Sequence, residues 1–154
     1  MSAGAARGTI RAKAMVQLID ESGTRQLVYR HPADPASGPA DFHRLLGGGI
    51  EFGELAEAAA IREIEEELGV RLPAVDFLGV GESVFVHEGE LGHEIVFLFR
   101  ATVAGDVVAD DGAWFDDEGV PMYVLWRPLD DASGIPLYPE ALEELTRQAP
   151  TLEG

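Results

Sequence analysis

Apolar residues recur along the chain in short runs separated by polar, glycine-rich or proline-rich breaks, a pattern typical of β-strands. The runs at 12–19 and 26–30 flank the tetrapeptide Asp20-Glu21-Ser22-Gly23, which predicts a β-hairpin. Further runs predict strands at 75–86, 93–103 and 122–126, the first two joined by a polar turn at 88–92.

Two segments have helical rather than strand character. Residues 54–68 are rich in Ala, Glu and Leu, which favour helices, and Gly69 stands where a glycine C-cap is expected. Residues 139–148 predict a final amphipathic helix, with Leu142 and Leu145 on one side. Hairpins around one strong helix, with a second helix at the end, predict an α+β fold rather than a strict βαβ alternation.

The breaks between these elements predict loops of three kinds. Residues 31–41 contain three prolines and predict a long loop, residues 45–53 are glycine-rich, and residues 106–119 predict an acidic loop around Trp114 and Phe115. Residues 1–8 predict a flexible tail.

Charge and composition narrow the function classes. The 154 residues hold 11 Lys and Arg against 28 Asp and Glu, for a net charge of −17. Such a field repels bulk nucleic acid, although metal cations could still bridge the acids to a small phosphorylated substrate. The chain has no cysteine, which excludes disulfides and thiolate metal sites. With no apolar run of about 18 residues and no leader pattern, we expect one cytoplasmic domain over 1–154, away from membranes.

Three acids of the predicted helix, Glu63, Glu66 and Glu67, fall within an arc of about 100° on a helical wheel. Ile61, Ile64 and Leu68 form the stripe expected to pack on the core, roughly opposite the acids. The small residues Ala56 and Ala59 extend the acidic side. Crowded carboxylates either form a solvated face or hold hard divalent cations such as Mg²⁺ or Mn²⁺.

The spacing of these acids favours the second interpretation. Gly48 is followed after five residues by Glu54, and after seven more by Arg62-Glu63-Ile64-Glu65-Glu66-Glu67-Leu68-Gly69-Val70. This arrangement resembles the Nudix box, G-x5-E-x7-R-E-U-x-E-E-x-G-U with U aliphatic, and every defined position is met. Many family members have Pro before the glycines, where this chain has Leu46.

The resemblance implies the Nudix fold, an α/β/α sandwich with a central mixed sheet and hairpins. It also implies Mg²⁺- or Mn²⁺-dependent hydrolysis of a diphosphate linked to another moiety. Glu66 and Glu67 match the main metal ligands, and Glu63 matches a further ligand or the general base. Arg62 matches the arginine that orients the carboxylates, and Glu54 matches the first acid of the box.

Other site residues follow from the same resemblance. A backbone carbonyl of Gly47 or Gly48 is expected to bind metal, and Gly47, Gly48, Gly49 and Glu94 are expected to contact substrate. Family members often take one more carboxylate from outside the box, for which the candidates are Glu94, Asp110, Asp111, Asp116, Asp117 and Glu118. Candidate substrate contacts are His43, His87 and His93, and candidate stacking residues are Phe42, Phe85, Trp114 and Tyr123.

These observations predict a pyrophosphohydrolase acting on a nucleoside diphosphate derivative, with a (d)NTP as the default because subfamily signatures downstream of the box are missing. ADP-ribose or a sugar nucleotide is the alternative within the enzyme class. A catalytically silent Nudix-fold module that binds a nucleotide or a partner, and an acidic domain with an accidental match, are alternatives outside it. The resemblance also leaves a homodimer open.

Overall fold

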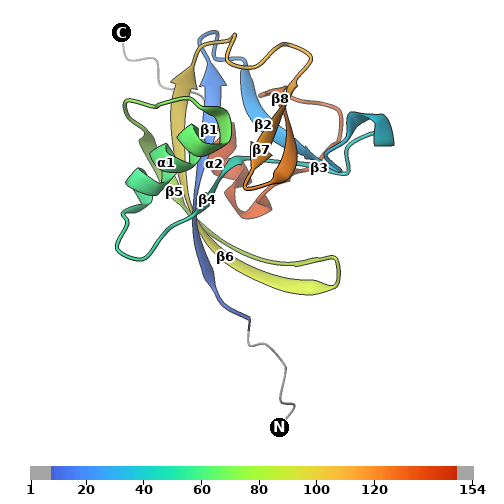
Figure 1. Cartoon of the computed structure of the whole chain (residues 1–154). Coiled ribbons are helices and arrows are strands. Elements are labelled where there is room, and N and C mark those ends of the chain that lie inside the picture. Colours follow the sequence, from blue (N-terminus) through green and yellow to red (C-terminus); the bar gives the residue numbers. More distant parts are fainter. Residues whose placement is uncertain (1–7, 149–154) are drawn as a thin grey trace.

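The computed structural model describes residues 8–148, so the predicted tail at residues 1–8 lies outside the described residues apart from Gly8. A mixed sheet lies between helix α1 on one face and a short C-terminal helical segment on the other (Figure 1). The strands are β1 (Arg11–Asp20), β2 (Arg25–His31), β3 (Phe42–Arg44), β4 (Leu46–Gly49), β5 (Asp76–His87), β6 (Glu90–Val103), β7 (Ala113–Asp117), β8 (Val120–Pro128) and β9 (Leu137–Tyr138). The helices are α1 (Ala56–Leu68) and α2 (Glu143–Arg147), with 3-10 turns η1 (Pro35–Ser37) and η2 (Glu140–Leu142).

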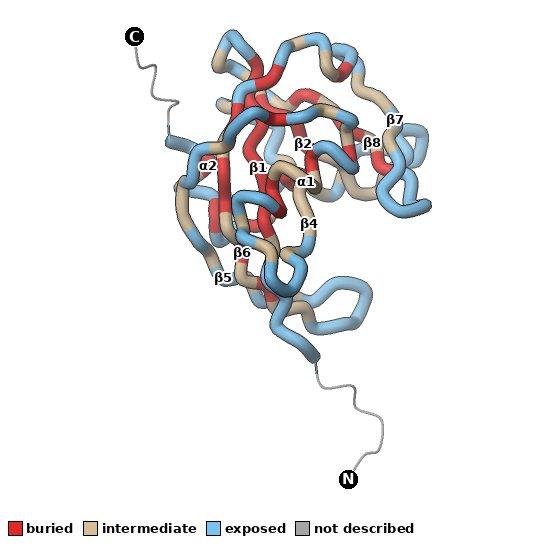
Figure 2. Tube along the Cα trace, turned by 60° about the vertical axis from the view of Figure 1, so that its left-hand side comes forward, coloured by how far each residue is buried: buried red, intermediate tan, exposed pale blue. Residues whose placement is uncertain are grey.

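Strand β1 is buried on both faces and separates two apolar cores. Its residues Ala14 and Val16 pack with α1, whereas Met15 packs with Leu142 of η2 on the other face. This alternation follows from the two-residue period of a strand. In Figure 2 the buried part of the chain lies between α1 and α2.

The sheet divides beside β1, and this division positions the segment at 48–70 that carries the glycines and acids described above. β1 is parallel to β6 along its whole length, but it pairs with β2 only at Ile19 and Gln26. From there β2 continues with β8 and β3, while β4 pairs antiparallel with Lys13–Val16 of β1. The glycines of β4 therefore lie against the central strand and beneath α1.

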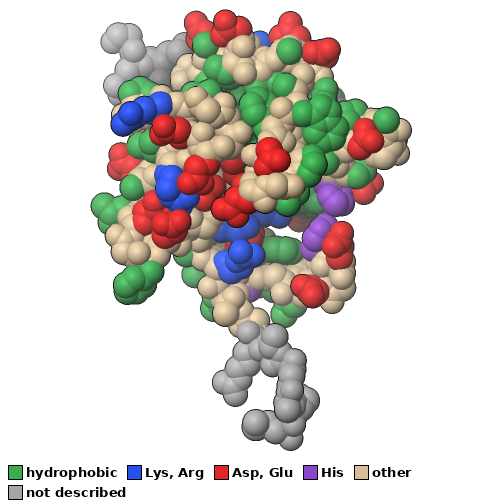
Figure 3. Space-filling model, viewed as in Figure 1, with side chains coloured by type: hydrophobic (Ala, Val, Ile, Leu, Met, Phe, Trp, Pro, Cys, Tyr) green, Lys and Arg blue, Asp and Glu red, His purple; other side chains and the backbone are tan. Residues whose placement is uncertain are grey.

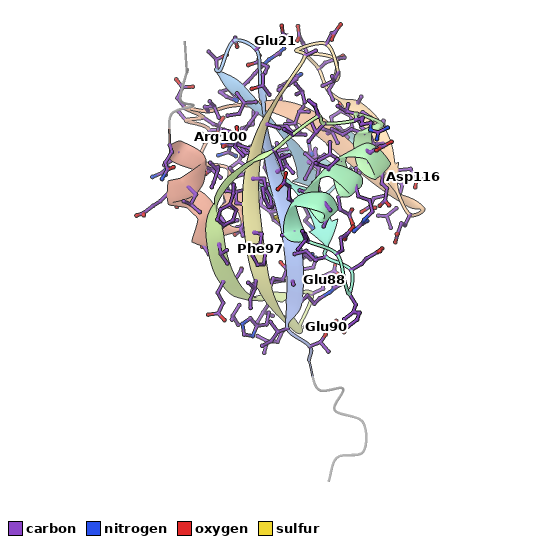
Figure 4. All side chains as sticks on the ribbon, turned by 90° about the vertical axis from the view of Figure 1, so that its left-hand side faces the viewer. Glu21, Glu88, Glu90, Phe97, Arg100 and Asp116 are labelled. Atoms are coloured by element: carbon purple, nitrogen blue, oxygen red, sulfur yellow. The ribbon has the colours of Figure 1, made fainter. Side chains whose placement is uncertain are left out.

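Most predicted elements are confirmed, including the first hairpin, the long β5–β6 hairpin and the mixed sheet. Figure 4 shows Glu88 and Glu90 at the tip of the β5–β6 hairpin, at the opposite end of the molecule from Glu21. In residues 8–148 no helix has the length and apolar character needed to cross a membrane.

Three predictions about the elements are wrong in detail. Helix α1 begins at Ala56, because Glu54 lies in the preceding turn and binds Arg62. The segment predicted as an acidic loop contains β7, which pairs with β8 through Trp114 and Phe115. The final helix is a 3-10 turn followed by a short α-helix, because the backbone leaves helical geometry at Leu142 (φ −105°, ψ 5°), whose side chain is fully buried.

His43 lies in the interior rather than on a substrate surface, with 6% of its area exposed. Arg127 donates from Nη1 to His43 Nδ1 at 3.0 Å and to the Ile135 carbonyl at 2.8 Å. A ring nitrogen that accepts from arginine carries no proton, so His43 is neutral and joins β3 to the segment after β8. Burial, together with the nearby Arg127 charge, lowers the pKa of His43 to about 4.

This arrangement predicts an acid-sensitive fold. The neutral form of His43 is favoured in the folded state, so its contribution is complete above pH 6.5 and is lost as the pH falls toward 4. Between pH 7 and pH 5, His43 should account for a loss of about 2 kcal/mol in unfolding free energy. Urea unfolding at both pH values should show this extra loss in the wild type and in the surface control His93→Gln. An equal loss in His43→Gln would contradict the prediction.

Candidate active site

Arg62 connects three segments through one guanidinium group. Its Nε and Nη2 donate to the two carboxylate oxygens of Glu54 at 2.7 and 2.8 Å, and Nη2 also donates to the Gly49 carbonyl at 3.0 Å. Its Nη1 donates to Glu63 at 3.0 Å and to Glu66 at 3.2 Å. The bond from Arg62 is the main reason that the pKa of Glu54 falls to about 2. The pKa of Arg62 itself is raised by these acids, so Arg62 stays charged.

Glu63 lies directly against the backbone of β4. A Cβ added at Gly48 would overlap the Glu63 carboxyl group, and one added at Gly47, whose φ is +145°, would overlap the Ala14 carbonyl. Only glycine at these two positions lets β4 fit between β1 and the acids of α1. Burial raises the pKa of Glu63 despite the opposing effect of Arg62.

Glu67 is the buried acid of the site. Only 5% of its area is exposed, and its Oε2 is enclosed without a hydrogen-bond partner. Burial first, and then the charges of Asp117 and Glu63, raise the pKa of Glu67 to about 9, against a lowering effect of the Gly47 N–H. The carboxyl lines a cavity of about 240 Å³ between β4, β2 and the β7–β8 hairpin.

The prediction that the acids lie opposite the core is wrong for part of the helix. Glu67 and Ala59 are buried, whereas Glu66 remains about half exposed. Glu67 and Ala59 are buried because β4 and β7 both pack on the side of α1 that carries them. A helical wheel contains no information about elements that cover the side of a helix.

The donor set fits a hard cation. Within residues 8–148 no three acidic or histidine side chains already converge on one point, because Arg62 holds oxygens of Glu63 and Glu66. However, the partnerless Oε2 of Glu67 is a buried oxygen that a cation would satisfy. The oxygens available nearby, from carboxylates and the Gly48 backbone, are the ligands that Mg²⁺ and Mn²⁺ favour.

Of the candidate acids outside the box, the structure brings Asp117 to the site. Asp117 lies at the end of β7 and lines the same cavity as Glu67. Asp110 binds Arg25 at 2.9 Å, and Asp116 accepts from the Gly119 N–H in its own turn. Glu94 lies elsewhere, where its two oxygens bind Lys13 at 2.6 Å and Arg44 at 3.1 Å.

A larger cavity of about 440 Å³ adjoins the first, since Tyr29 and His31 line both. Its wall is aromatic: Phe42 stacks on His31 with ring centroids 4.8 Å apart and contacts Tyr138 at 4.9 Å. Figure 3 shows acidic side chains crowded over α1, basic side chains beside them, and histidines across the hollow above the β5–β6 hairpin.

Some of the predicted substrate-contact residues lie in the larger cavity and others do not. Phe42, Phe85, His87 and Glu94 all line the larger cavity. Trp114 and Tyr123 instead pack edge to face on each other, and His93 binds Glu82 at 2.8 Å on the surface. The sequence reading missed Tyr29, His31, Arg44 and Tyr138. The alternation of Phe42 and Arg44 in the strand before the glycines was a signal for Arg44.

Comparison with known proteins decides the family. A family model described as NUDIX domain matches residues 9–149. The chain belongs to the Nudix family. Members of this family generally use divalent metal ions, which agrees with the oxygen-rich donor set described above.

Curated Nudix relatives share part of their length with the chain. It is 29% identical over 79 residues to the NAD-capped RNA hydrolase NudC of Pseudomonas aeruginosa, covering 51% of this chain and 28% of that protein. It is 34% identical over 96 residues to the oxidized purine nucleoside triphosphate hydrolase of Danio rerio, covering 60% of this chain and 59% of that protein. The chain therefore spans less than two thirds of these relatives.

Solved structures confirm the Nudix fold. The MutT NUDIX hydrolase of Burkholderia pseudomallei superposes with a TM-score of 0.56 at 25% identity, covering 90% of this chain and 98% of that one. A mutT/nudix family protein from Listeria innocua gives a TM-score of 0.60 at 22% identity, covering 92% of each chain.

The contact between Gly48 and Glu63 predicts a sharp difference between neighbouring glycines. In Gly48→Ala the new methyl group displaces the Glu63 carboxyl, so we expect Mn²⁺ affinity to fall by about tenfold or more. Gly49→Ala is the matched control, because a Cβ there meets nothing within 4 Å. Titration calorimetry with Mn²⁺ on both folded variants checks the prediction, and equal losses in the two would contradict it.

Proposed function

We propose that this Nudix protein is a Mg²⁺- or Mn²⁺-dependent pyrophosphohydrolase that cleaves a nucleoside diphosphate derivative, with a (d)NTP as the foremost substrate class. The observation that carries the proposal is the buried Glu67 carboxyl, which has one oxygen without a hydrogen-bond partner and lines a small cavity together with Asp117. A fold that only needed a soluble helix surface would place this acid in water, because burial without a partner is costly.

The proposed roles follow from the contacts. Glu63, Glu66, Glu67 and the Gly48 carbonyl would hold the metal, with Glu63 also the candidate general base. A bound divalent cation neutralises diphosphate charge and lowers the pKa of water. Arg62 fixes Glu54, Glu63 and Glu66 relative to the β4 backbone, and so acts as a positioning residue. Asp117 adds a carboxylate from the opposite side of the cavity.

The two adjoining cavities support a nucleotide substrate. A diphosphate beside Glu67 would place its organic moiety past Tyr29 and His31, in the larger aromatic cavity. The names of the relatives agree with nucleotide chemistry, since one acts on oxidized purine nucleoside triphosphates and another on NAD-capped RNA. The net charge of −17 disfavours long RNA for this chain.

Replacing Glu67 should abolish turnover. Chromatographic analysis of the products formed from NTPs, dNTPs, 8-oxo-dGTP, ADP-ribose, Ap4A and UDP-sugars, each with Mg²⁺ or Mn²⁺, should identify at least one nucleotide hydrolysed only with metal. Glu67→Gln keeps the shape of the side chain but can no longer ionise to bind a cation, so we expect kcat/KM to fall at least about 100-fold. Glu65→Gln, on the exposed side of the same helix, should stay within about twofold of the wild type.

The other outcomes separate the alternatives. Metal binding without hydrolysis of any compound would favour the binding module over the enzyme. Turnover confined to ADP-ribose or UDP-sugars would keep the enzyme but replace the substrate class. Full activity in Glu67→Gln would contradict the proposed metal site.

A further inference from the structure

Arg44 brings unused hydrogen-bond donors to the larger cavity. The residue ends β3, and its side chain is 18% exposed. Nη2 donates to Glu94 Oε1 at 3.1 Å, the guanidinium carbon lies 5.9 Å from the centre of the Phe85 ring, and Nε is enclosed without a partner. Because Nε is enclosed, a ligand acceptor in the cavity would take the remaining N–H groups of the guanidinium, of which Glu94 engages only Nη2.

Among the described residues that line the larger cavity, Arg44 is the only arginine or lysine. Glu94 is 3% exposed, and both of its oxygens are engaged, one by Arg44 and one by Lys13. Arg44 and Lys13 therefore share the Glu94 carboxylate, and the other acid of the cavity wall, Glu140, has no ion pair with Arg44. An electron-rich acceptor is favoured there, whereas a ligand N–H would face the N–H groups of a side chain that has no acceptor.

The shape of the cavity favours a planar ring over a bare anion. Its volume of about 440 Å³ lies within the range of small-molecule sites, and Phe42, Phe85 and Tyr138 line it. Aromatic walls bind flat faces, and one charged group in such a wall fixes orientation.

We propose, on the basis of the nucleotide hydrolase proposed above, that Arg44 is a specificity-determining residue that donates to a ring carbonyl of the nucleobase. Bases with an oxo group at this edge, such as hypoxanthine, guanine and uracil, present an acceptor to Arg44. Adenine and cytosine present an amino group in its place, and a donor then faces a donor. The chain therefore selects oxo-bases over amino-bases.

Two pairs of nucleotides test the effect of replacing an amino group of the base by an oxo group. ITP differs from ATP, and UTP from CTP, by an oxo group in place of an amino group and the accompanying ring proton. We expect kcat/KM to favour the oxo member of at least one pair by about ten- to a hundredfold, the effect of one hydrogen bond to a charged group. Equal kcat/KM values within both pairs, or a preference for the amino members, would overturn the proposal.

Substitution variants test whether Arg44 causes the preference for oxo-bases. Arg44→Lys keeps a positive charge beside Glu94 but loses the planar fork of N–H donors, so the ratio of kcat/KM between the oxo and amino members of a pair should fall toward one. Arg71→Lys, on the exposed segment after α1, is the matched control and should keep the wild-type ratio. An unchanged ratio in Arg44→Lys, or an equal rise of KM for all four nucleotides as expected of a phosphate contact, would contradict a base contact.

Failure of the proposed hydrolase is distinguishable from failure of this inference. If no nucleotide is hydrolysed, equilibrium binding of IMP and AMP, and of UMP and CMP, still measures the preference. Tighter binding of the oxo member in the wild type, lost in Arg44→Lys, would support the role of Arg44 even in a silent module. Equal binding within the pairs, or no binding of any of the four, would overturn it.

Discussion

The ion-pair cluster of Arg62 is the constraint on which the rest of the site depends. Glu63, Glu66 and Glu67 occupy neighbouring positions of one helix and repel one another, and Glu54 comes from the preceding loop. One guanidinium offsets this repulsion by binding three of the acids, and it also binds the Gly49 carbonyl of β4. The helix, the loop and the strand are therefore fixed relative to one another by a single side chain.

Burial of Glu67 depends on that fixed arrangement and on the division of the sheet. Where β2 leaves β1, β4 enters with two glycines whose lack of side chains lets the helix approach the strand. The β7–β8 hairpin then closes the remaining flank, which brings Asp117 toward Glu67. Placing a carboxyl there is unfavourable by itself, so the apolar packing on both faces of β1 has to outweigh it.

Features that depend on residues close together in the sequence could be predicted, whereas features that depend on contacts between distant segments could not. The box at 48–70 could be recognised because its residues act within one strand, one loop and one helix. The burial of Glu67 could not, because it depends on β7, some fifty residues downstream. The acidic composition around Trp114 concealed that strand, whose partner β8 supplies its hydrogen bonds. The role of Glu94 was likewise obscured, since Lys13 and Arg44 approach it from two other strands.

The two cavities differ in their lining residues in a way that suits a substrate with two unlike ends. The smaller cavity contains Glu67 and Asp117, and the one arginine or lysine among its described lining residues, Arg30, donates to the carbonyls of Pro32 and Gly38. The acids therefore favour phosphate there when metal cations intervene, and Arg62 cannot serve as a phosphate ligand while it binds three carboxylates. Among its described lining residues the larger cavity presents one arginine, Arg44, beside Glu94 and Glu140, and its aromatic walls favour a ring over a second phosphate. A nucleotide satisfies both conditions in one orientation, with its diphosphate toward Glu67 and its base toward Arg44. The reversed orientation would place phosphate among aromatic side chains and a neutral ring among carboxylates.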